Sequence, residues 1–132
     1  MSTRGLVDTN IVILRGRLAP GSLPDEPVIS AITQAELSIG PLLADDLSVA
    51  AARLAHLHAA ERDCIALPFD SECARAYARV AAELRKSGRK SAARAFDALI
   101  ASTAIAHDLP LYTTNPADFQ GIPELDLRPV EP

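Results

Sequence analysis

The 132-residue chain has no tryptophan, and aromatic residues make up only 4% of it. Proteins that bind single-stranded nucleic acid by stacking its bases use several aromatic side chains, so a base-stacking platform is poorly supported. The only two cysteines, Cys64 and Cys73, form no Cys-x-x-Cys motif and lie in no secretory context. We therefore expect two reduced, buried thiols rather than a disulfide.

The sequence also lacks a long hydrophobic run. Its most apolar stretch, Ala95–Ala106, contains Asp97 and is about half as long as the roughly 20 residues that a membrane-spanning helix needs. Polar residues interrupt the amino-terminal segment, which does not resemble a secretory signal. These features predict a cytoplasmic protein with no membrane partner. With 48% apolar and 23% charged residues, residues 1–132 are expected to form a single globular domain.

The spacing of the three histidines does not favour a catalytic or zinc centre. His56 and His58 are two residues apart, so they would point to different faces of a helix, and His107 lies far along the chain. A histidine-based nuclease or a zinc site is therefore disfavoured.

Charge is distributed unevenly along a chain whose net charge is −4. Residues 75–94 include seven basic residues against one acid, Glu83. A basic segment in an acidic protein could hold a phosphate backbone near an acidic metal site. Charge runs are more often solvated helix faces, however, and charge alone favours that alternative.

Short apolar runs alternate with segments of helical periodicity. Strands are predicted at Leu6–Val7, Val28–Ser30, Cys64–Leu67, Leu111–Thr114 and, at a sheet edge, Leu125–Val130. Helical segments are predicted at Ile11–Leu14, Ala31–Ile39 and Leu47–Ala60. Two more are predicted further on: one is capped by Asp70 or Ser71 and ends before Gly88, and the other is capped by Ser91 and ends at about Ala106. Strands separated by helices indicate an α/β fold with a parallel sheet covered on both faces.

Polar residues follow the first strand directly: Asp8, Thr9 and Asn10. Ligands bind at the carboxyl ends of strands in parallel sheets. A partly buried, ionised Asp8 would need a cation or several N–H donors. The structural alternative is that Asp8 caps a turn beginning at Asn10.

Two more acids are candidates for the same site. Glu36 lies in a helix that directly follows a strand, although Thr33 and Glu36 also have the spacing of a capping box. Asp97 shares a predicted helix face with apolar residues, where a charge is costly unless it is paired or metal-bound. The alternatives are that Asp97 caps a shorter helix beginning at Ala98, or forms an exposed ion pair with Arg94.

After the fourth predicted strand, Asn115 and Asp118 bring two further oxygen donors to the same edge. Asn-Pro is a common turn start and Asp118 could cap the turn before Phe119, so turn chemistry explains much of this segment.

Together these segments resemble the PIN-domain ribonucleases, and more narrowly the VapC toxins of bacterial type II toxin–antitoxin modules. The resemblance spans about residues 5 to 119. It rests on Leu-Val-Asp-Thr-Asn at 6–10, Ser-Ala-Ile-Thr-Gln-Ala-Glu-Leu-Ser-Ile-Gly at 30–40, Leu-Pro-Phe-Asp at 67–70, Phe-Asp-Ala-Leu-Ile-Ala-Ser-Thr-Ala at 96–104 and Thr-Asn-Pro-Ala-Asp-Phe at 114–119.

The resemblance implies a three-layer α/β/α fold with a mostly parallel sheet of four to five strands and an acidic pocket that holds Mg2+ or Mn2+. It also implies hydrolysis of RNA phosphodiester bonds, inhibition by a VapB-like antitoxin, and a homodimer that contacts operator DNA only through the antitoxin. By position, Asp8 and Asp97 would bind the metal directly and Glu36 directly or through water.

The fourth acidic position of the family is Asn115 here, and Asp118 is the candidate to compensate for it. Thr9, Asn10 and Thr114 would be supporting hydrogen-bonding residues. Two other functions stay open. A catalytically silent PIN domain would only bind RNA or a protein, and a haloacid-dehalogenase-like phosphohydrolase would require a second acid where the chain has Asn10.

Overall fold

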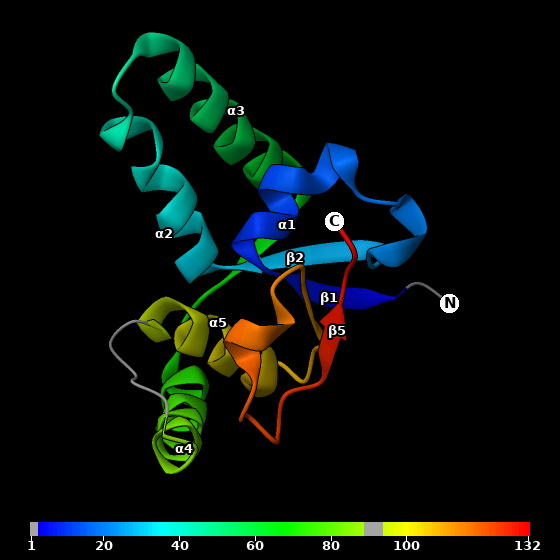
Figure 1. Cartoon of the computed structure of the whole chain (residues 1–132), viewed down its shortest axis with the longest axis vertical. Coiled ribbons are helices and arrows are strands. Elements are labelled where there is room, and N and C mark those ends of the chain that lie inside the picture. The colour runs from blue at the N-terminus through cyan, green and yellow to red at the C-terminus, as the bar shows by residue number, and fades with distance from the viewer. Residues whose placement is uncertain (1–2, 89–93) are drawn as a thin grey trace.

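The computed structural model describes residues 3–88 and 94–132, in which five strands form a single sheet (Figure 1). The strands are β1 (Arg4–Val7), β2 (Glu26–Ser30), β3 (Ile65–Leu67), β4 (Leu111–Thr113) and β5 (Leu127–Pro129). Their order is β3-β2-β1-β4-β5, and every neighbouring pair is parallel. The predicted parallel α/β architecture is confirmed, and the predicted edge strand at Leu125–Val130 is present but shorter, as Leu127–Pro129.

Helices cover both faces of this sheet (Figure 1). On one face lie α1 (Thr9–Leu14), α2 (Ala31–Ile39) and α3 (Leu47–Asp63), and on the other α4 (Ser71–Lys86) and α5 (Ala95–Ala106). Short 3-10 turns connect them: η1 (Arg15–Arg17), η2 (Pro20–Ser22), η3 (Pro41–Leu43) and η5 (Pro116–Phe119). No helix in the described part of the chain has the length and apolar character that crossing a membrane requires.

The sheet separates two hydrophobic cores, because successive side chains of a strand point to opposite faces. Leu6 packs with Val28 and Leu111 in the core beneath α4 and α5. The next residues, Val7 and Ile29, pack in the core beneath α1, α2 and α3. Strands buried on both faces have continuous apolar runs rather than an alternating pattern, which explains the sequence of β1.

Most predicted boundaries agree with the structure, and α2 has the predicted ends. Helix α3 continues to Asp63, because no residue after Ala60 interrupts it before the strand. Helix α4 is capped by Asp70 and α3 by Asp46. The predicted Ser91 cap lies outside the described residues. Cys64 and Cys73 are free thiols; Cys73 is buried and Cys64 half-buried.

The buried stripe of α4 differs from the predicted one. The sequence pattern favours a stripe of Cys73, Ala74, Tyr77, Ala81 and Leu84. In the structure Ala74 is exposed, and the buried residues are Cys73, Ala76, Val80 and Leu84. Alanines occur on several sides of this helix, so apolar spacing alone does not determine which of them faces the core.

The strand order creates a crevice beside β1. From β1 the chain moves outward through β2 to β3, and then returns to β4 on the other side of β1. Ligand sites in parallel α/β sheets form at such a switch point, outside the carboxyl ends of the strands. The backbone N–H of Asp8 donates to the Tyr112 carbonyl oxygen at 3.0 Å, which fixes the end of β1 against β4.

Candidate active site

Asp8 is the most buried acid of the crevice, with only 6% of its surface exposed. Its Oδ1 accepts a hydrogen bond from the Thr9 backbone N–H at 2.8 Å, and its Oδ2 accepts one from the Thr113 hydroxyl at 2.9 Å. Asp8 therefore caps α1, as the structural alternative predicted, although the helix begins at Thr9. Burial raises the pKa of Asp8 above its usual value despite these two hydrogen bonds, and the charge of Asp118 adds to the rise.

Glu36 is connected to the end of β1 through a hydroxyl. The Thr9 hydroxyl donates to Glu36 Oε1 at 2.8 Å and lies 3.0 Å from the Thr33 hydroxyl. The capping-box alternative is wrong, because Ser30 caps α2 by accepting the Thr33 backbone N–H at 3.0 Å. Burial raises the pKa of Glu36, and the charge of Asp8 raises it further.

Asp97 lies in the first turn of α5, which begins at Ala95, so it is not the N-cap of a shorter helix. It is half-buried. Burial, followed by the charges of Asp8, Asp118 and Glu36, raises the pKa of Asp97 from 3.8 to about 6. The pKa of Asp97 therefore responds to all three of the other carboxylates.

Asp118 lies in η5 and accepts a hydrogen bond from the Arg94 guanidinium. The two side chains are 40% and 35% exposed, so solvent screens this ion pair. The predicted alternative pairing of Arg94 with Asp97 is not formed. The charge of Arg94 nevertheless keeps the pKa of Asp97 lower than its acidic neighbours alone would set it.

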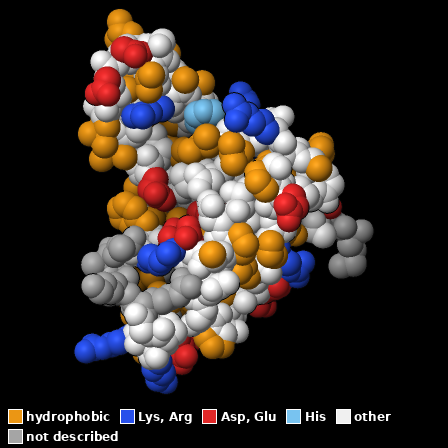
Figure 2. Space-filling model, viewed as in Figure 1, with side chains coloured by type: hydrophobic (Ala, Val, Ile, Leu, Met, Phe, Trp, Pro, Cys, Tyr) orange, Lys and Arg blue, Asp and Glu red, His pale blue; other side chains and the backbone are white. Residues whose placement is uncertain are grey.

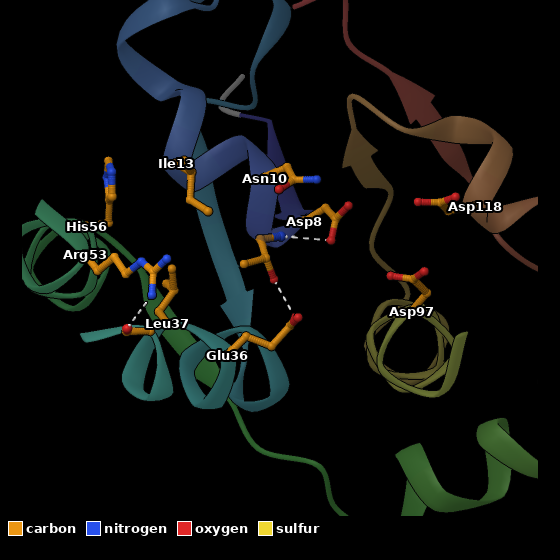
Figure 3. A pocket seen from close by; sticks show the side chains of 11 residues that line it. Asp8, Asn10, Ile13, Glu36, Leu37, Arg53, His56, Asp97 and Asp118 are labelled. Carbon is orange, nitrogen blue, oxygen red and sulfur yellow. Dashed lines mark hydrogen bonds between the residues drawn. The ribbon is translucent and has the colours of Figure 1, made fainter. Parts of the chain in front are cut away.

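Four acids from four separate segments line one cavity of about 320 Å³ (Figure 3). Asp8 comes from the end of β1, Glu36 from α2, Asp97 from α5 and Asp118 from η5. The complete lining is Asp8, Thr9, Asn10, Ile13, Glu36, Leu37, Gly40, Arg53, His56, Asp97 and Asp118. The structure thus brings together acids that are up to 110 residues apart in sequence, at the edge where the strands end.

Two of the predicted site residues, Asn115 and Thr114, are not among those that line the cavity. The Asn115 backbone N–H donates to the Thr113 hydroxyl at 3.0 Å, and its side-chain amide meets the Thr114 hydroxyl at 3.5 Å. Asn115 therefore stabilises the turn after β4. Of the two candidates for the fourth oxygen donor, Asp118 is the one that lines the cavity.

Sequence reasoning missed several residues of the site. Thr113 holds Asp8, and Thr33 shares the Thr9 hydroxyl, but a buried threonine in a strand or helix gives no sequence signal of such a role. Arg53 and His56 lie on α3, whose apolar spacing suggested core packing or a dimer contact rather than a place in the site. The positions of these two residues depend on how α3 packs against α2.

The acids fit a hard divalent cation by their chemistry, since such ions prefer carboxylate oxygens. Within residues 3–88 and 94–132, no three Asp, Glu, His or Cys side chains lie close enough together to form a ready-made cation site. Two carboxylates about 4 Å apart repel by roughly 4 kcal/mol at an effective dielectric of 20, so acids that line one cavity affect one another's ionisation. The raised pKa values of Asp8, Glu36 and Asp97 have this repulsion as one cause.

Comparison with known proteins identifies the family. The sequence model of the PIN-domain family matches residues 6–125 of this chain. Ribonuclease VapC5 of Mycobacterium tuberculosis is 37% identical over 112 residues, which cover 83% of this chain and 81% of the relative. Ribonuclease VapC of Rickettsia bellii is 33% identical over 129 residues, 95% of either chain.

A solved structure agrees with these relatives. The VapBC-5 toxin–antitoxin structure from Mycobacterium tuberculosis contains a chain that is 32% identical, with a TM-score of 0.85 over 97% of this chain and 99% of the other. The chain described here belongs to the PIN-domain family. Within that family it is similar to the VapC ribonucleases, and the haloacid-dehalogenase alternative is not supported.

Replacing Asp97 by asparagine is expected to stabilise the metal-free protein at neutral pH. Between pH 3.8 and about 6 the unfolded chain has released the Asp97 proton that the folded protein still binds, so this residue makes stability fall as pH rises. In EDTA at pH 7.5, Asp97→Asn should raise Tm by a few degrees, and the gain should vanish below pH 4.

Thermal unfolding across this pH range measures the effect. Asp45→Asn, at an exposed position outside the cavity, removes the same charge and serves as the control. Equal changes in Tm for the two variants at pH 7.5 would contradict the burial and the repulsion that raise the pKa of Asp97.

Proposed function

We propose that this protein is a divalent-metal-dependent RNA endonuclease that acts as the toxin of a toxin–antitoxin pair. The observation that carries the proposal is the convergence of four carboxylates on one cavity, at the strand ends of a chain that belongs to the PIN-domain family. The names of its relatives, which are called ribonucleases, support the reaction. The toxin–antitoxin assignment of a 32% identical structure supports the biological role.

In this proposal Asp8 and Asp97 bind the metal directly, and Glu36 binds it directly or through water. Asp118 takes the fourth position in preference to Asn115, since it lines the cavity. Mg2+ is the expected ion and Mn2+ an alternative, because both accept oxygen ligands. A bound ion would supply positive charge against the phosphate under attack and favour ionisation of the attacking water.

The other groups of the site position these acids. Thr113 and the Thr9 backbone N–H hold both oxygens of Asp8, which fixes its orientation. The Thr9 hydroxyl holds only Oε1 of Glu36, so Oε2 is available to orient a water molecule. Asn10 offers an uncharged amide at the cavity wall, where it adds no repulsion. A supporting role for Thr114 remains a prediction from the family resemblance.

The surface beside the cavity fits a protein partner. Helices α2 and α3 form an arm that extends away from the sheet, and Figure 2 shows hydrophobic side chains gathered over it. Ile39, Leu42, Leu43 and Leu47 are 51%, 83%, 66% and 88% exposed. Large exposed apolar side chains that cluster mark interaction surfaces. We assign this apolar arm to a VapB-like antitoxin, because the same two helices line the cavity and a partner on them would obstruct RNA.

Three other expectations remain predictions from the sequence. They are a homodimer, contact with operator DNA only through the antitoxin, and a cytoplasmic location.

Divalent metal is expected to raise the thermal stability of the EDTA-treated protein, because a cation relieves the repulsion among the carboxylates. At a hundredfold excess over Kd the gain is about 2.7 kcal/mol. Asp8→Asn should remove most of it and Asp45→Asn none, as measured by thermal unfolding with and without Mg2+ or Mn2+. The same metal-induced shift in Asp8→Asn as in the wild type would refute Asp8 as a ligand.

The wild-type protein is expected to cleave single-stranded RNA with Mg2+ and not with EDTA. Asp97→Asn should lower kcat by about two to four orders of magnitude, because it removes a charged group from the reacting centre. Gel analysis of labelled RNA measures this, with Asp45→Asn as the control. Metal-independent RNA binding without cleavage by the wild type would support the catalytically silent alternative instead.

Leu42→Glu is expected to weaken binding of the antitoxin encoded beside the toxin by more than about tenfold, because it buries a charge at the interface. Cleavage of RNA by the free toxin should be unchanged. Ile65→Glu, at a 63% exposed position on the edge strand β3, is the matched control. Binding measured by calorimetry that is equal for both variants would exclude the apolar arm as the docking surface.

A further inference from the structure

The cavity has two chemically different ends. Its acidic end lies between β1, α5 and η5, as described above. Its other end lies between α1, the carboxyl end of α2, and α3, and is lined by Ile13, Leu37, Gly40, Arg53 and His56 (Figure 3). This second end has two apolar side chains, one arginine and one histidine, and no acid. The proposed metal chemistry accounts for none of these side chains.

Among the described residues Arg53 has no acidic partner, a feature that it shares with Arg4, Arg17 and Arg85. Its Nη1 donates to the Gly40 carbonyl oxygen at 2.9 Å, and none of the ion pairs within the described residues includes it. By contrast, carboxylates pair with Arg15, Arg62, Arg75, Arg79, Arg94 and Arg128. A guanidinium has five N–H donors, so the bond to Gly40 leaves most of them available.

Arg53 is an exposed side chain whose stem lies beside the end of α2, in addition to that hydrogen bond. A Cβ atom placed on Gly40 would lie 3.4 Å from Cδ and 3.6 Å from Cβ of Arg53. The end of α2 therefore rests against the stem of this side chain. A guanidinium held in this way loses less conformational entropy when it binds an anion than a freely moving one does.

The acidic end creates an electrostatic problem for an RNA substrate. RNA carries a negative charge at every nucleotide, and four carboxylates surround the point where the proposed function places the scissile phosphate. A cation on another wall of the same cavity attracts the neighbouring part of the backbone and lowers the cost of that approach.

We propose that Arg53 binds a backbone phosphate of the RNA next to the scissile one. Ile13 and Leu37 would contact the sugar or base between the two phosphates, and His56 would offer one further N–H donor. This inference rests on the proposed function, because it deepens the same site by naming the group that positions its substrate. It makes Arg53 a binding residue for RNA rather than a structural cap of α2.

A phosphate suits this end of the cavity better than a stacked base. Guanidinium groups bind phosphate through two parallel N–H bonds, which matches the free donors of Arg53. No phenylalanine, tyrosine or tryptophan is among the cavity-lining residues, so a broad stacking surface is not present there. The contact would therefore be insensitive to base identity and sensitive to salt.

The test measures RNA binding in an Asp97→Asn background, so that cleavage does not consume the probe. The probe is a fluorescently labelled single-stranded RNA of mixed sequence, titrated with Mg2+ at several salt concentrations. Arg53→Gln should weaken binding about tenfold. It should also reduce the slope of log K against log salt by about 0.7, the value for one phosphate contact on a single strand. Arg53→Lys should keep the slope, because it keeps the charge.

Arg62→Gln is a control on the same helix, at an arginine that already pairs with Asp63. It removes the same charge from the same helix, nine residues further on, where the helical repeat of 3.6 places a side chain on the opposite face. Affinity and salt slope should equal those of the parent. If Arg53→Gln leaves the RNA affinity and the salt slope unchanged, as Arg62→Gln is expected to do, the proposal is overturned. An altered affinity for the antitoxin with unchanged RNA binding would overturn it too, and would assign Arg53 to the protein partner.

Cleavage kinetics with Asp97 intact separate this inference from the proposed function. Arg53→Gln should raise KM about tenfold and leave kcat within about twofold, since Arg53 touches no reacting atom. A lower kcat with an unchanged KM would overturn the binding role. If the wild type does not cleave RNA at all, the proposed function fails, while the binding measurement still decides the role of Arg53.

Discussion

The burial of several carboxylates that repel one another in one cavity is the constraint on which the site depends. Asp8, Glu36 and Asp97 all have pKa values raised first by burial and then by one another or by Asp118. An acid in this setting costs stability when it is ionised and unpaired. The fold offsets part of that cost through hydroxyl and backbone donors at Asp8 and through Arg94, which pairs with Asp118. The remaining negative potential is what a cation would bind.

The sequence predicted the fold well, because strands buried on both faces and amphipathic helices have distinct apolar patterns. It also identified Asp8, since an acid directly after an apolar strand lies at the carboxyl edge of a parallel sheet. Asp97 was recognisable because a charge on an apolar helix face requires a partner. For Asp8 and Asp97 the local sequence pattern and the sheet topology both indicate a place at the carboxyl edge of the sheet, where the structure has them line the cavity.

Other parts of the site depend on packing that no local pattern encodes. Thr33 and Glu36 have the spacing of a capping box, but Ser30 caps the helix instead, because the helix begins at Ala31. Asn115 and Asp118 are three residues apart in one turn, and only the direction of that turn decides which of them faces the cavity. Arg53 was missed because its place depends on the contact of α3 with α2.

The strand order has a consequence for how the protein is made. Asp8 and Glu36 belong to the first third of the chain, whereas Asp97 and Asp118 arrive only after β4 inserts beside β1. Such long-range pairing forms late, once most of the polypeptide has left the ribosome. A chain that ends before α5 therefore carries two of the four acidic groups, and one that ends before β4 carries three of them. The complete cavity exists only when synthesis is nearly finished, whereas the exposed apolar residues between Ile39 and Leu47 are made much earlier.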